Sequence, residues 1–287
     1  PFDEIKWVKR VSKIIGADGS VVFEFKDVCV PEFWSQLATD ILASKYLRKA
    51  GVPESGHEKG AKELISRIVK AIRGFGSKNG YFASEDDADI FESELTFLLV
   101  NQYAAFNSPV WFNCGLYESY GITGCSTGNW FWNEQTNQFE KTVDAYSRPQ
   151  LSACFIISIK DDLMDIAEHV KKEMRIFKFG SGSGTNFSTL RAQGEKLSNG
   201  GTSSGLMSFL QVYDRAAGAI KSGGTTRRAA KMVVVDADHP EIFEFVKWKQ
   251  VEEEKAIALM RAGFGGGMDG EAYRTVSGQN SNNSVRV

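Results

Sequence analysis

Apolar residues recur every three or four positions in three segments of the first hundred residues, and this spacing predicts three amphipathic helices. The repeating positions are Phe33, Leu37, Ile41 and Leu42, then Leu64, Ile68, Val69 and Ile72, and then Ile90, Phe91, Leu95, Leu98 and Leu99. The third helix has a start signal at residues 84–87, Ser-Glu-Asp-Asp, because a serine cap and first-turn acids stabilise a helix N-terminus. We expect Gly74, Gly76 and Gly80 to break the second helix.

One strand is also predicted in this part of the chain. Residues 20–30 are rich in β-branched and aromatic side chains that alternate in part, and a turn signal at residues 17–19 precedes them. With three helices and one strand, residues 1–105 are expected to form a mainly helical N-terminal region.

The pattern changes after residue 105. Residues 106–113 are short and contain a proline, so no helix is predicted there, and residues 115–149 form a long segment of glycine, aromatic and polar residues. Strands and helices then alternate: strand 153–159, helix 162–178, a glycine loop, strand 185–190, helix 204–220, loop 221–228, strand 229–235 and helix 239–249. Such alternation favours parallel strands covered by helices, as a barrel or an open sheet. We therefore expect an α/β domain over residues 106–287.

Composition narrows the class of protein. The chain has 34 Lys and Arg against 36 Asp and Glu, a net charge of −2, so charge gives no indication of a nucleic-acid partner. No apolar run approaches the roughly 18 residues of a membrane span. The four cysteines form no CxxC pair and no zinc-type spacing, so we expect reduced thiols in the cytoplasm and no metal site. The absence of an initiator methionine and the polar final segment lead us to expect a fragment.

Candidate chemistry begins at Cys154, in the sequence Ser-Ala-Cys-Phe-Ile. Residues 179–186, Phe-Gly-Ser-Gly-Ser-Gly-Thr-Asn, follow after one amphipathic stretch. Alternating glycines let a backbone approach a phosphate or sugar closely, because no Cβ stands in the way. A lone strand cysteine is usually a small buried hydrophobe, but beside this loop it is a candidate thiol acting on a nucleotide-like substrate. The loop is not a dinucleotide fingerprint, because it follows a helix and not a strand.

Three further polar features each have two interpretations. Residues 221–228, Lys-Ser-Gly-Gly-Thr-Thr-Arg-Arg, are either a solvated basic turn or a flexible element that reads base or phosphate groups. Arg191 is either a surface cation or a phosphate contact. Asp161 and Asp162 either cap a helix or bind a ribose hydroxyl. The three histidines form no constellation typical of a hydrolase.

Taken in order, these segments resemble the class II, adenosylcobalamin-dependent ribonucleotide reductases in their long bacterial form. The stretches that carry the resemblance are residues 33–38, 98–103, 106–113, 152–156, 177–186, 220–224, 226–232, 238–240 and 282–287. So many collinear matches identify the chain as similar to the N-terminal portion of such an enzyme.

The resemblance implies a helical region followed by the first part of a ten-stranded α/β barrel made of two five-stranded halves. It implies radical reduction of ribonucleoside di- or triphosphates to deoxyribonucleotides, with adenosylcobalamin as cofactor. A cysteine pair then supplies two electrons, becomes a disulfide and is reset by a thioredoxin-like reductant. The implied partners also include a deoxynucleoside triphosphate as allosteric effector and the remaining C-terminal part of the enzyme, and a homodimer is allowed.

Site residues are assigned from the resemblance position by position. Cys154 matches the first member of the reducing pair. The positions that match substrate contacts are Ser108 and, through their backbone groups, Ala153, Ser181 and Gly182. The positions that match the effector site are Asp161, Asp162 and Arg191, together with the relaying loop Gly223, Gly224, Thr225, Thr226, Arg227 and Arg228.

Two parts of the family pattern are missing. The thiyl-radical motif Asn-Pro-Cys-Gly-Glu is absent, and so is the second reducing cysteine, because Cys29, Cys114 and Cys125 lie in the wrong segments. Most cobalamin contacts are likewise expected outside this chain. We therefore expect that the chain alone does not turn over.

Two alternatives stay open at this point. A fragment of a class I large subunit would share the barrel but take its radical from a partner protein. A non-catalytic nucleotide-binding module would keep only the effector site. The second is disfavoured because a partial barrel exposes an apolar sheet edge.

Overall fold

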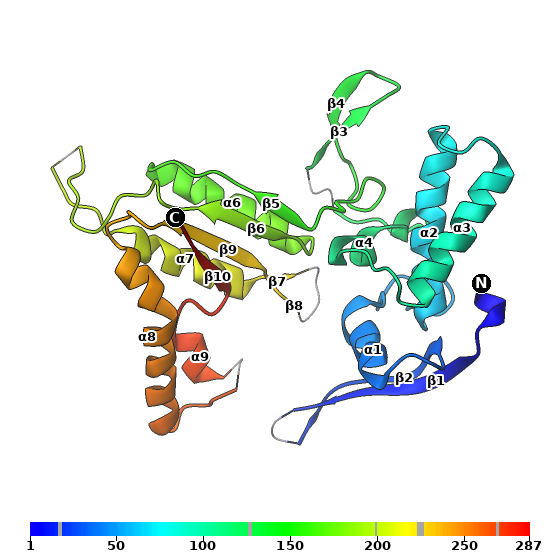
Figure 1. Ribbon diagram of the computed structural model, residues 1–287, viewed down its shortest axis with the longest axis horizontal. Helices are drawn as coiled ribbons and strands as arrows, with labels where there is room; N and C mark the ends of the chain where they lie inside the picture. The colour runs from blue at the N-terminus through cyan, green and yellow to red at the C-terminus, as the bar shows by residue number, and fades with distance from the viewer. Residues whose placement is uncertain (17–18, 126–127, 199, 223–226, 268–269) are drawn as a thin grey trace. The chain divides into compact units, whose positions relative to one another are not determined.

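The computed structural model describes residues 1–16, 19–125, 128–198, 200–222, 227–267 and 270–287, with the backbone alone at 221, 222, 227 and 228. These residues form two compact units, Pro1–Ser152 and Ala153–Val287. Figure 1 labels most of the helices and strands of each unit. The domain boundary expected after residue 105 stays a prediction.

The N-terminal unit combines helices with two antiparallel hairpins. Its helical elements are η1 (Phe2–Glu4), α1 (Gln36–Ile41), the π-helical turn η2 (Leu42–Tyr46), α2 (Ala61–Lys78), α3 (Glu85–Val100), α4 (Ser108–Asn113) and α5 (Leu116–Tyr120). Its hairpins pair β1 (Trp7–Ile15) with β2 (Val21–Pro31) and β3 (Trp130–Asn133) with β4 (Gln138–Lys141). The three predicted helices and the strand at residues 20–30 are confirmed. The third helix begins as expected, with the Ser84 side chain accepting from the Asp87 amide.

Three details of this unit differ from the sequence prediction. Helix α2 does not break at Gly74 or Gly76 but runs to Lys78. Position 76 has no room for a side chain, because a Cβ there would lie 2.6 Å from the Phe82 ring. Strand β1 was not predicted, and it forms because β2 supplies an antiparallel partner. Helix α4 forms despite Pro109, which lies in the first turn, where the missing N–H costs nothing.

A buried ion pair contacts several elements of the N-terminal unit. Arg67 Nε on α2 donates to Glu58 Oε1 at 2.6 Å, and the two side chains are 1% and 0% exposed. Glu58 also accepts from the Arg48 amide at 2.8 Å and from the Tyr120 hydroxyl at 3.0 Å. Another guanidinium nitrogen donates to the carbonyl oxygen of Cys114, next to the end of α4. The pair therefore joins α2, α4, α5 and the segment that precedes α2.

The C-terminal unit is an α/β unit built on a parallel sheet. Its strands are β5 (Cys154–Ile156), β6 (Gly182–Asn186), β9 (Lys231–Asp236) and β10 (Ser281–Arg286), in the spatial order β10-β9-β6-β5. Its helices are α6 (Leu163–Lys178), α7 (Leu206–Ala219), α8 (Ile242–Arg261) and α9 (Glu271–Thr275). A two-residue antiparallel ladder of β7 (Lys221–Ser222) and β8 (Arg227–Arg228) precedes β9.

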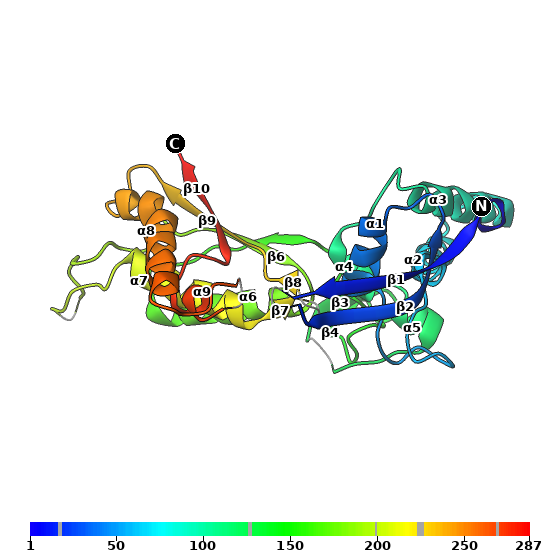
Figure 2. The same ribbon diagram turned by 90° about the horizontal axis from the view of Figure 1, so that it is seen from below.

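Strand order matches chain order, so each new strand is added to the same edge of the sheet. With right-handed crossovers, this winding places the connecting helices on one face. Figure 2 shows α6, α7 and α8 on the same side of the sheet. Burial along β9 agrees, because Lys231, Val233 and Val235 are buried while Met232 between them is 43% exposed. We call the face that carries these three buried residues the helix-covered face, and the opposite one the uncovered face.

The predicted α/β alternation is confirmed, with several shifts in the bounds. Strand β5 covers only Cys154–Ile156 of the predicted strand 153–159. Strand β6 begins three residues before the predicted strand 185–190, because Gly182 and Gly184 belong to the strand and not to a preceding loop. Helix α8 runs to Arg261, well beyond residue 249. In the part of the chain described by the structure, no helix is both long and apolar enough to cross a membrane.

The Glu58–Arg67 pair generates a stability prediction. Glu58→Gln should lower the free energy of unfolding by about 3–5 kcal/mol, because it leaves a buried guanidinium without its anion. Glu32→Gln is the matched control: Glu32 pairs with Lys6 at 2.6 Å, but the side chains are 51% and 74% exposed. The Glu32→Gln variant should lower the free energy of unfolding by less than about 1 kcal/mol. Urea unfolding of both variants measures the difference, and equal losses would contradict the assignment.

Candidate functional site

Cys154 lies on the uncovered face of the parallel sheet. It is in register with Gly182 of β6, and Ile156 is in register with Gly184. The Cys154 side chain is exposed, and Ile156 is 97% exposed. Because side chains alternate along a strand, the two neighbouring positions on the same face of β6 are both glycine. The thiol therefore borders a strip of bare backbone.

Sterics explain one of these glycines. A Cβ at Gly182 would lie 2.9 Å from the Ala230 carbonyl oxygen, so a side chain there would push β6 away from the segment that enters β9. A Cβ at Gly184 would meet only Met232, at an ordinary 3.7 Å. Packing therefore requires glycine at position 182. At position 184 a Cβ would fit, so packing does not explain the glycine there.

The predicted substrate-contacting residues fall into two groups. Ala153, Cys154 and Gly182 are brought together, since the Gly182 amide donates to the Ala153 carbonyl oxygen at 2.7 Å. That hydrogen bond occupies two of the backbone groups that we expected to line the substrate. Ser181 is buried next to them. Ser108 belongs to the N-terminal unit, where its hydroxyl lies 3.1 Å from the Tyr46 hydroxyl, so its role stays a prediction.

The four cysteines are all free thiols in different surroundings. Cys154 and Cys125 are exposed, Cys29 is half-buried and Cys114 is buried. Burial raises the pKa of the Cys114 thiol to about 11, and it also raises the pKa of Cys29. Neither of these thiols is suited to exchange chemistry, because the thiolate is the reactive form.

Two predicted effector residues line one polar cavity of about 470 Å³. Arg191 Nε donates to the Asp161 carboxylate, and Arg191 Nη1 reaches the carbonyl oxygen of Lys196 at 3.3 Å. Ser188 and His239 also line the cavity. Its charged and hydroxyl groups suit a ligand that combines phosphate with sugar hydroxyls.

The other predicted effector residues are not placed in this cavity. Asp162 caps α6, accepting from the amides of Met164 and Asp165, each at 3.0 Å, so the capping interpretation is confirmed. Residues 223–226, which include Gly223, Gly224, Thr225 and Thr226, lie outside the described residues. Arg227 and Arg228 form β8, and only their backbone pairing is described.

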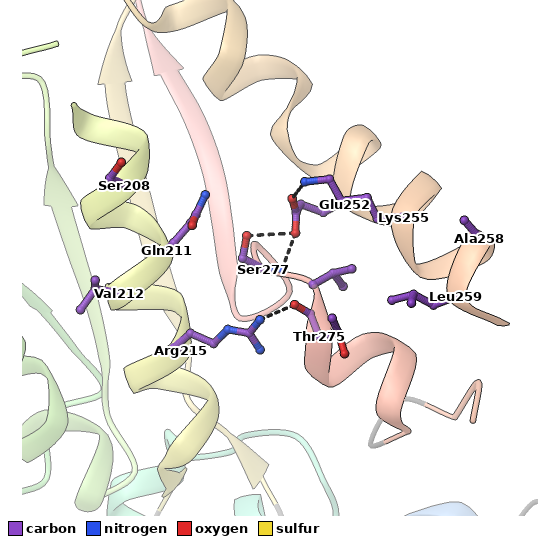
Figure 3. A pocket seen from close by; sticks show the side chains of 11 residues that line it. Ser208, Gln211, Val212, Arg215, Glu252, Lys255, Ala258, Leu259, Thr275 and Ser277 are labelled. Atoms are coloured by element: carbon purple, nitrogen blue, oxygen red, sulfur yellow. Dashed lines mark hydrogen bonds and ion pairs between the residues drawn. The ribbon is translucent and has the colours of Figure 1, made fainter. Parts of the chain in front are cut away.

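Sequence reasoning missed other groups that line cavities. His239 was interpreted only as part of a helix start, yet it is buried, with Nε2 at 2.9 Å from the Leu190 carbonyl oxygen. A larger cavity of about 890 Å³ lies among α7, α8 and the segment after α9 (Figure 3). There the Arg215 side chain donates to the Thr275 carbonyl oxygen, and Glu252 accepts from the Ser277 hydroxyl at 3.1 Å. The residues that line this larger cavity are far apart in sequence, so they formed no recognisable sequence motif.

Comparison with known proteins identifies the protein family. Residues 152–287 match the family described as ribonucleotide reductase, barrel domain, and residues 8–102 match the family described as class II vitamin B12-dependent ribonucleotide reductase. A vitamin B12-dependent ribonucleotide reductase of Agrobacterium fabrum is 47% identical over 294 residues, covering 90% of this chain and 23% of the relative. One of Rhodopirellula baltica is 45% identical over 287 residues, covering 100% of this chain and 28% of the relative.

Residues 152–287, which include the parallel α/β unit, thus belong to the ribonucleotide reductase barrel family. With the N-terminal match added, the chain belongs to the class II, vitamin B12-dependent family of these enzymes. The resemblance seen in the sequence is confirmed, and class II is favoured over class I. The chain spans about a quarter of the length of these curated relatives.

The different surroundings of the thiols generate a labelling prediction. Iodoacetamide at pH 8 should modify Cys154 and Cys125 in the folded chain and leave Cys114 unmodified. A thiol with a pKa of about 11 is only about one part in a thousand thiolate at that pH, and Cys114 is also shielded from the reagent. Peptide mass spectrometry before and after urea unfolding measures this. Protection of Cys154 in the native chain would contradict its placement on an open face.

Proposed function

We propose that this chain is part of an enzyme that reduces ribonucleotides to deoxyribonucleotides, with Cys154 as one of two reducing thiols. The observation that supports this most directly is the exposed thiol on the uncovered face, with bare backbone at Gly182 and Gly184 beside it. A ribose ring needs close approach to a thiol, and these glycines leave room for it. We further propose that the four-stranded sheet is part of a ten-stranded barrel whose interior is the uncovered face.

The role of Cys154 is a two-electron reduction. The two thiols lose their protons and two electrons as an S–S bond forms, the ribose 2′ C–O bond breaks, the hydroxyl leaves as water and a C–H bond forms at that carbon. A thioredoxin-like dithiol then restores the pair by exchange. Cys114 is too deeply buried to be the second thiol. We assign that role to the part of the relatives that this chain does not cover.

Adenosylcobalamin is the cofactor that the family implies, and it supplies the initiating radical when bound. The uncovered face is sterically open to so bulky a group, since Cys154 is exposed and its neighbours on β6 are glycines. We propose that most cofactor contacts come from outside this chain. What the chain itself contributes is the position of one thiol and a clear surface beside it. A cytoplasmic location and a homodimer remain parts of the same proposal.

The 470 Å³ cavity is proposed as the effector site for a deoxynucleoside triphosphate. Arg191 and Lys196 supply positive charge, and Asp161 holds the Arg191 guanidinium in one orientation. Residues 223–228 precede β9 in the chain and are proposed to relay effector identity to the substrate face. Such a relay requires a segment with a conformational equilibrium that both the effector and the substrate shift.

A charge-removal variant tests the effector site. Arg191→Ala should weaken deoxynucleoside triphosphate binding about tenfold or more, because a hydrogen bond to a charged group contributes about 1.5–3 kcal/mol. Arg261→Ala, which removes an exposed arginine at the end of α8, is the matched control and should leave affinity unchanged. Isothermal titration calorimetry of the 287-residue chain measures both. Equal affinities for the two variants would refute the site.

Catalysis is tested in a chimera in which this chain replaces the matching segment of the Agrobacterium fabrum relative. Cys154→Ser should abolish deoxyribonucleotide formation with a dithiol reductant, because no disulfide can form, whereas Cys125→Ser should leave it intact. The isolated chain should form no product. Turnover by the isolated chain, or by the Cys154→Ser chimera, would overturn the proposed role.

A further inference from the structure

The polar cavity of about 470 Å³ is lined by segments that follow three neighbouring parallel strands. Asp161 follows β5, Arg191 and Lys196 follow β6, and His239 follows β9. The cavity therefore lies at the carboxyl ends of the strands, where parallel sheets commonly bind ligands. We call residues 187–205, which connect β6 to α7, the β6–α7 loop. Both cations belong to this loop, so its conformation determines where their charges lie.

The two arms of the β6–α7 loop pair with each other. The Gly194 amide donates to the Ser203 carbonyl oxygen at 3.0 Å, and the Ser203 amide donates to the Glu195 carbonyl oxygen at 2.8 Å. Lys196 and Thr202 form an isolated antiparallel bridge. Gly194, Glu195 and Lys196 are all exposed, so burial does not hold this arm in place. Its position therefore depends on how the two ends of the loop are held.

His239 holds the first arm next to Arg191. Its Nε2 lies 2.9 Å from the Leu190 carbonyl oxygen, and its Nδ1 accepts from the Glu241 amide at 3.1 Å. A carbonyl oxygen only accepts and a backbone amide only donates, so the ring is neutral with its proton on Nε2. Both nitrogens are thus occupied, and the residue is only 6% exposed. His239 offers no polar atom to a ligand, so it acts through the loop.

Glu241 holds the other end of the loop. Its Oε2 accepts from the amide of Leu206, the first residue of α7, at 2.7 Å. Gly205 has no side chain with which to cap this helix, so the Glu241 carboxylate supplies the negative charge that a helix N-terminus favours. A Cβ at Gly205 would lie 2.7 Å both from the Gln193 amide nitrogen and from Glu241 Oε1. The two arms therefore come close together beside this carboxylate.

Both residues belong to the short turn between β9 and α8. The His239 amide donates to the Asp236 carbonyl oxygen at the end of β9 at 3.1 Å, and the Phe245 amide of α8 donates to the Glu241 carbonyl oxygen at 3.0 Å. The turn is thus fixed to a strand and to a helix. Because β9 pairs with β6, the turn also lies beside the start of the β6–α7 loop.

We propose that His239 and Glu241 are positioning residues for the effector cavity, which hold both ends of the β6–α7 loop and so place Arg191 and Lys196 for an anionic ligand. This inference rests on the proposed function, in which the cavity binds a deoxynucleoside triphosphate. Holding the loop before the ligand arrives lowers the conformational entropy that is lost on binding.

The first test compares two substitutions of one histidine by calorimetric titration with each of the four deoxynucleoside triphosphates. His239→Leu removes the donor to the Leu190 carbonyl oxygen and should weaken binding about tenfold, whereas His239→Gln keeps an amide donor and should stay within about threefold of the parent chain. The matched control is His169→Leu, because this buried histidine contacts the Thr185 hydroxyl at 2.9 Å and does not line the cavity. Parent-like affinity in His239→Leu would overturn the proposal, as would equal losses in the leucine variants of the two histidines.

A double-mutant cycle with Arg191 separates positioning from a general loss of structure. In the Arg191→Ala background the guanidinium next to Leu190 is already gone, so adding His239→Leu should weaken nucleotide binding by no more than about twofold. A substitution that only damaged the fold would weaken binding by the same factor in both backgrounds. Equal factors in the two backgrounds would therefore refute the positioning role.

Amide hydrogen exchange tests the loop without nucleotide. In Glu241→Ala and in His239→Leu, the Gly194 and Ser203 amides should exchange roughly tenfold faster than in the parent chain, because the arms open more easily. Glu241→Gln keeps an oxygen for the Leu206 amide and should exchange like the parent. The Phe187 amide, which donates to the Val234 carbonyl oxygen at 2.9 Å, is the internal reference and should not change.

The two experiments distinguish failure of this inference from failure of the proposed function. Absence of nucleotide binding by the parent chain would refute the effector site, and the exchange rates would still show whether the two residues hold the loop. Parent-like exchange at Gly194 and Ser203 in both Glu241→Ala and His239→Leu would overturn the inference even if the parent chain binds nucleotide.

Discussion

The alternation of side chains along β6 is the constraint on which the C-terminal unit depends. In five residues this strand turns Ser183 and Thr185 toward the helices and Gly182 and Gly184 toward the uncovered face. The hydroxyls satisfy buried polar groups of α6, and the glycines clear the surface beside Cys154. A register slip of one residue would exchange the two sets, burying glycine where hydroxyls are needed and crowding the thiol.

Much of the fold was predictable because its signals are local. The helices at residues 64–72 and 90–99 follow from apolar spacing, and the cap at Ser84 follows from residue type. What could not be predicted depends on partners distant in sequence. Strand β1 exists because β2 pairs with it, and position 76 requires glycine because Phe82 packs against it. Glycines at 182 and 184 suggested a loop because glycine is unfavourable in strands, and only the packing against Ala230 shows why one of them lies in β6.

The candidate site, like the fold, was predictable only in part. Resemblance pointed to Asp161, Asp162 and Arg191 together, and the structure joins the first and last of these in one cavity while assigning Asp162 to the cap of α6. The buried ion pairs left no trace in the sequence pattern. Lys231 and Glu173, which form one of them in the C-terminal unit, are 58 positions apart, and a lysine at the start of a strand is ordinarily a solvated residue. Buried ion pairs between distant residues can be recognised only from the folded structure.

The sequential strand order of the C-terminal unit bears on how the chain is made. Strand β6 pairs with β5, β9 with β6 and β10 with β9, so each strand that emerges during synthesis finds its neighbour already present. None of these pairings has to wait for a segment synthesised much later, as strands in a sheet of interleaved order do. Neighbouring strands of this sheet therefore become available in the order in which the chain is synthesised, from the N-terminus.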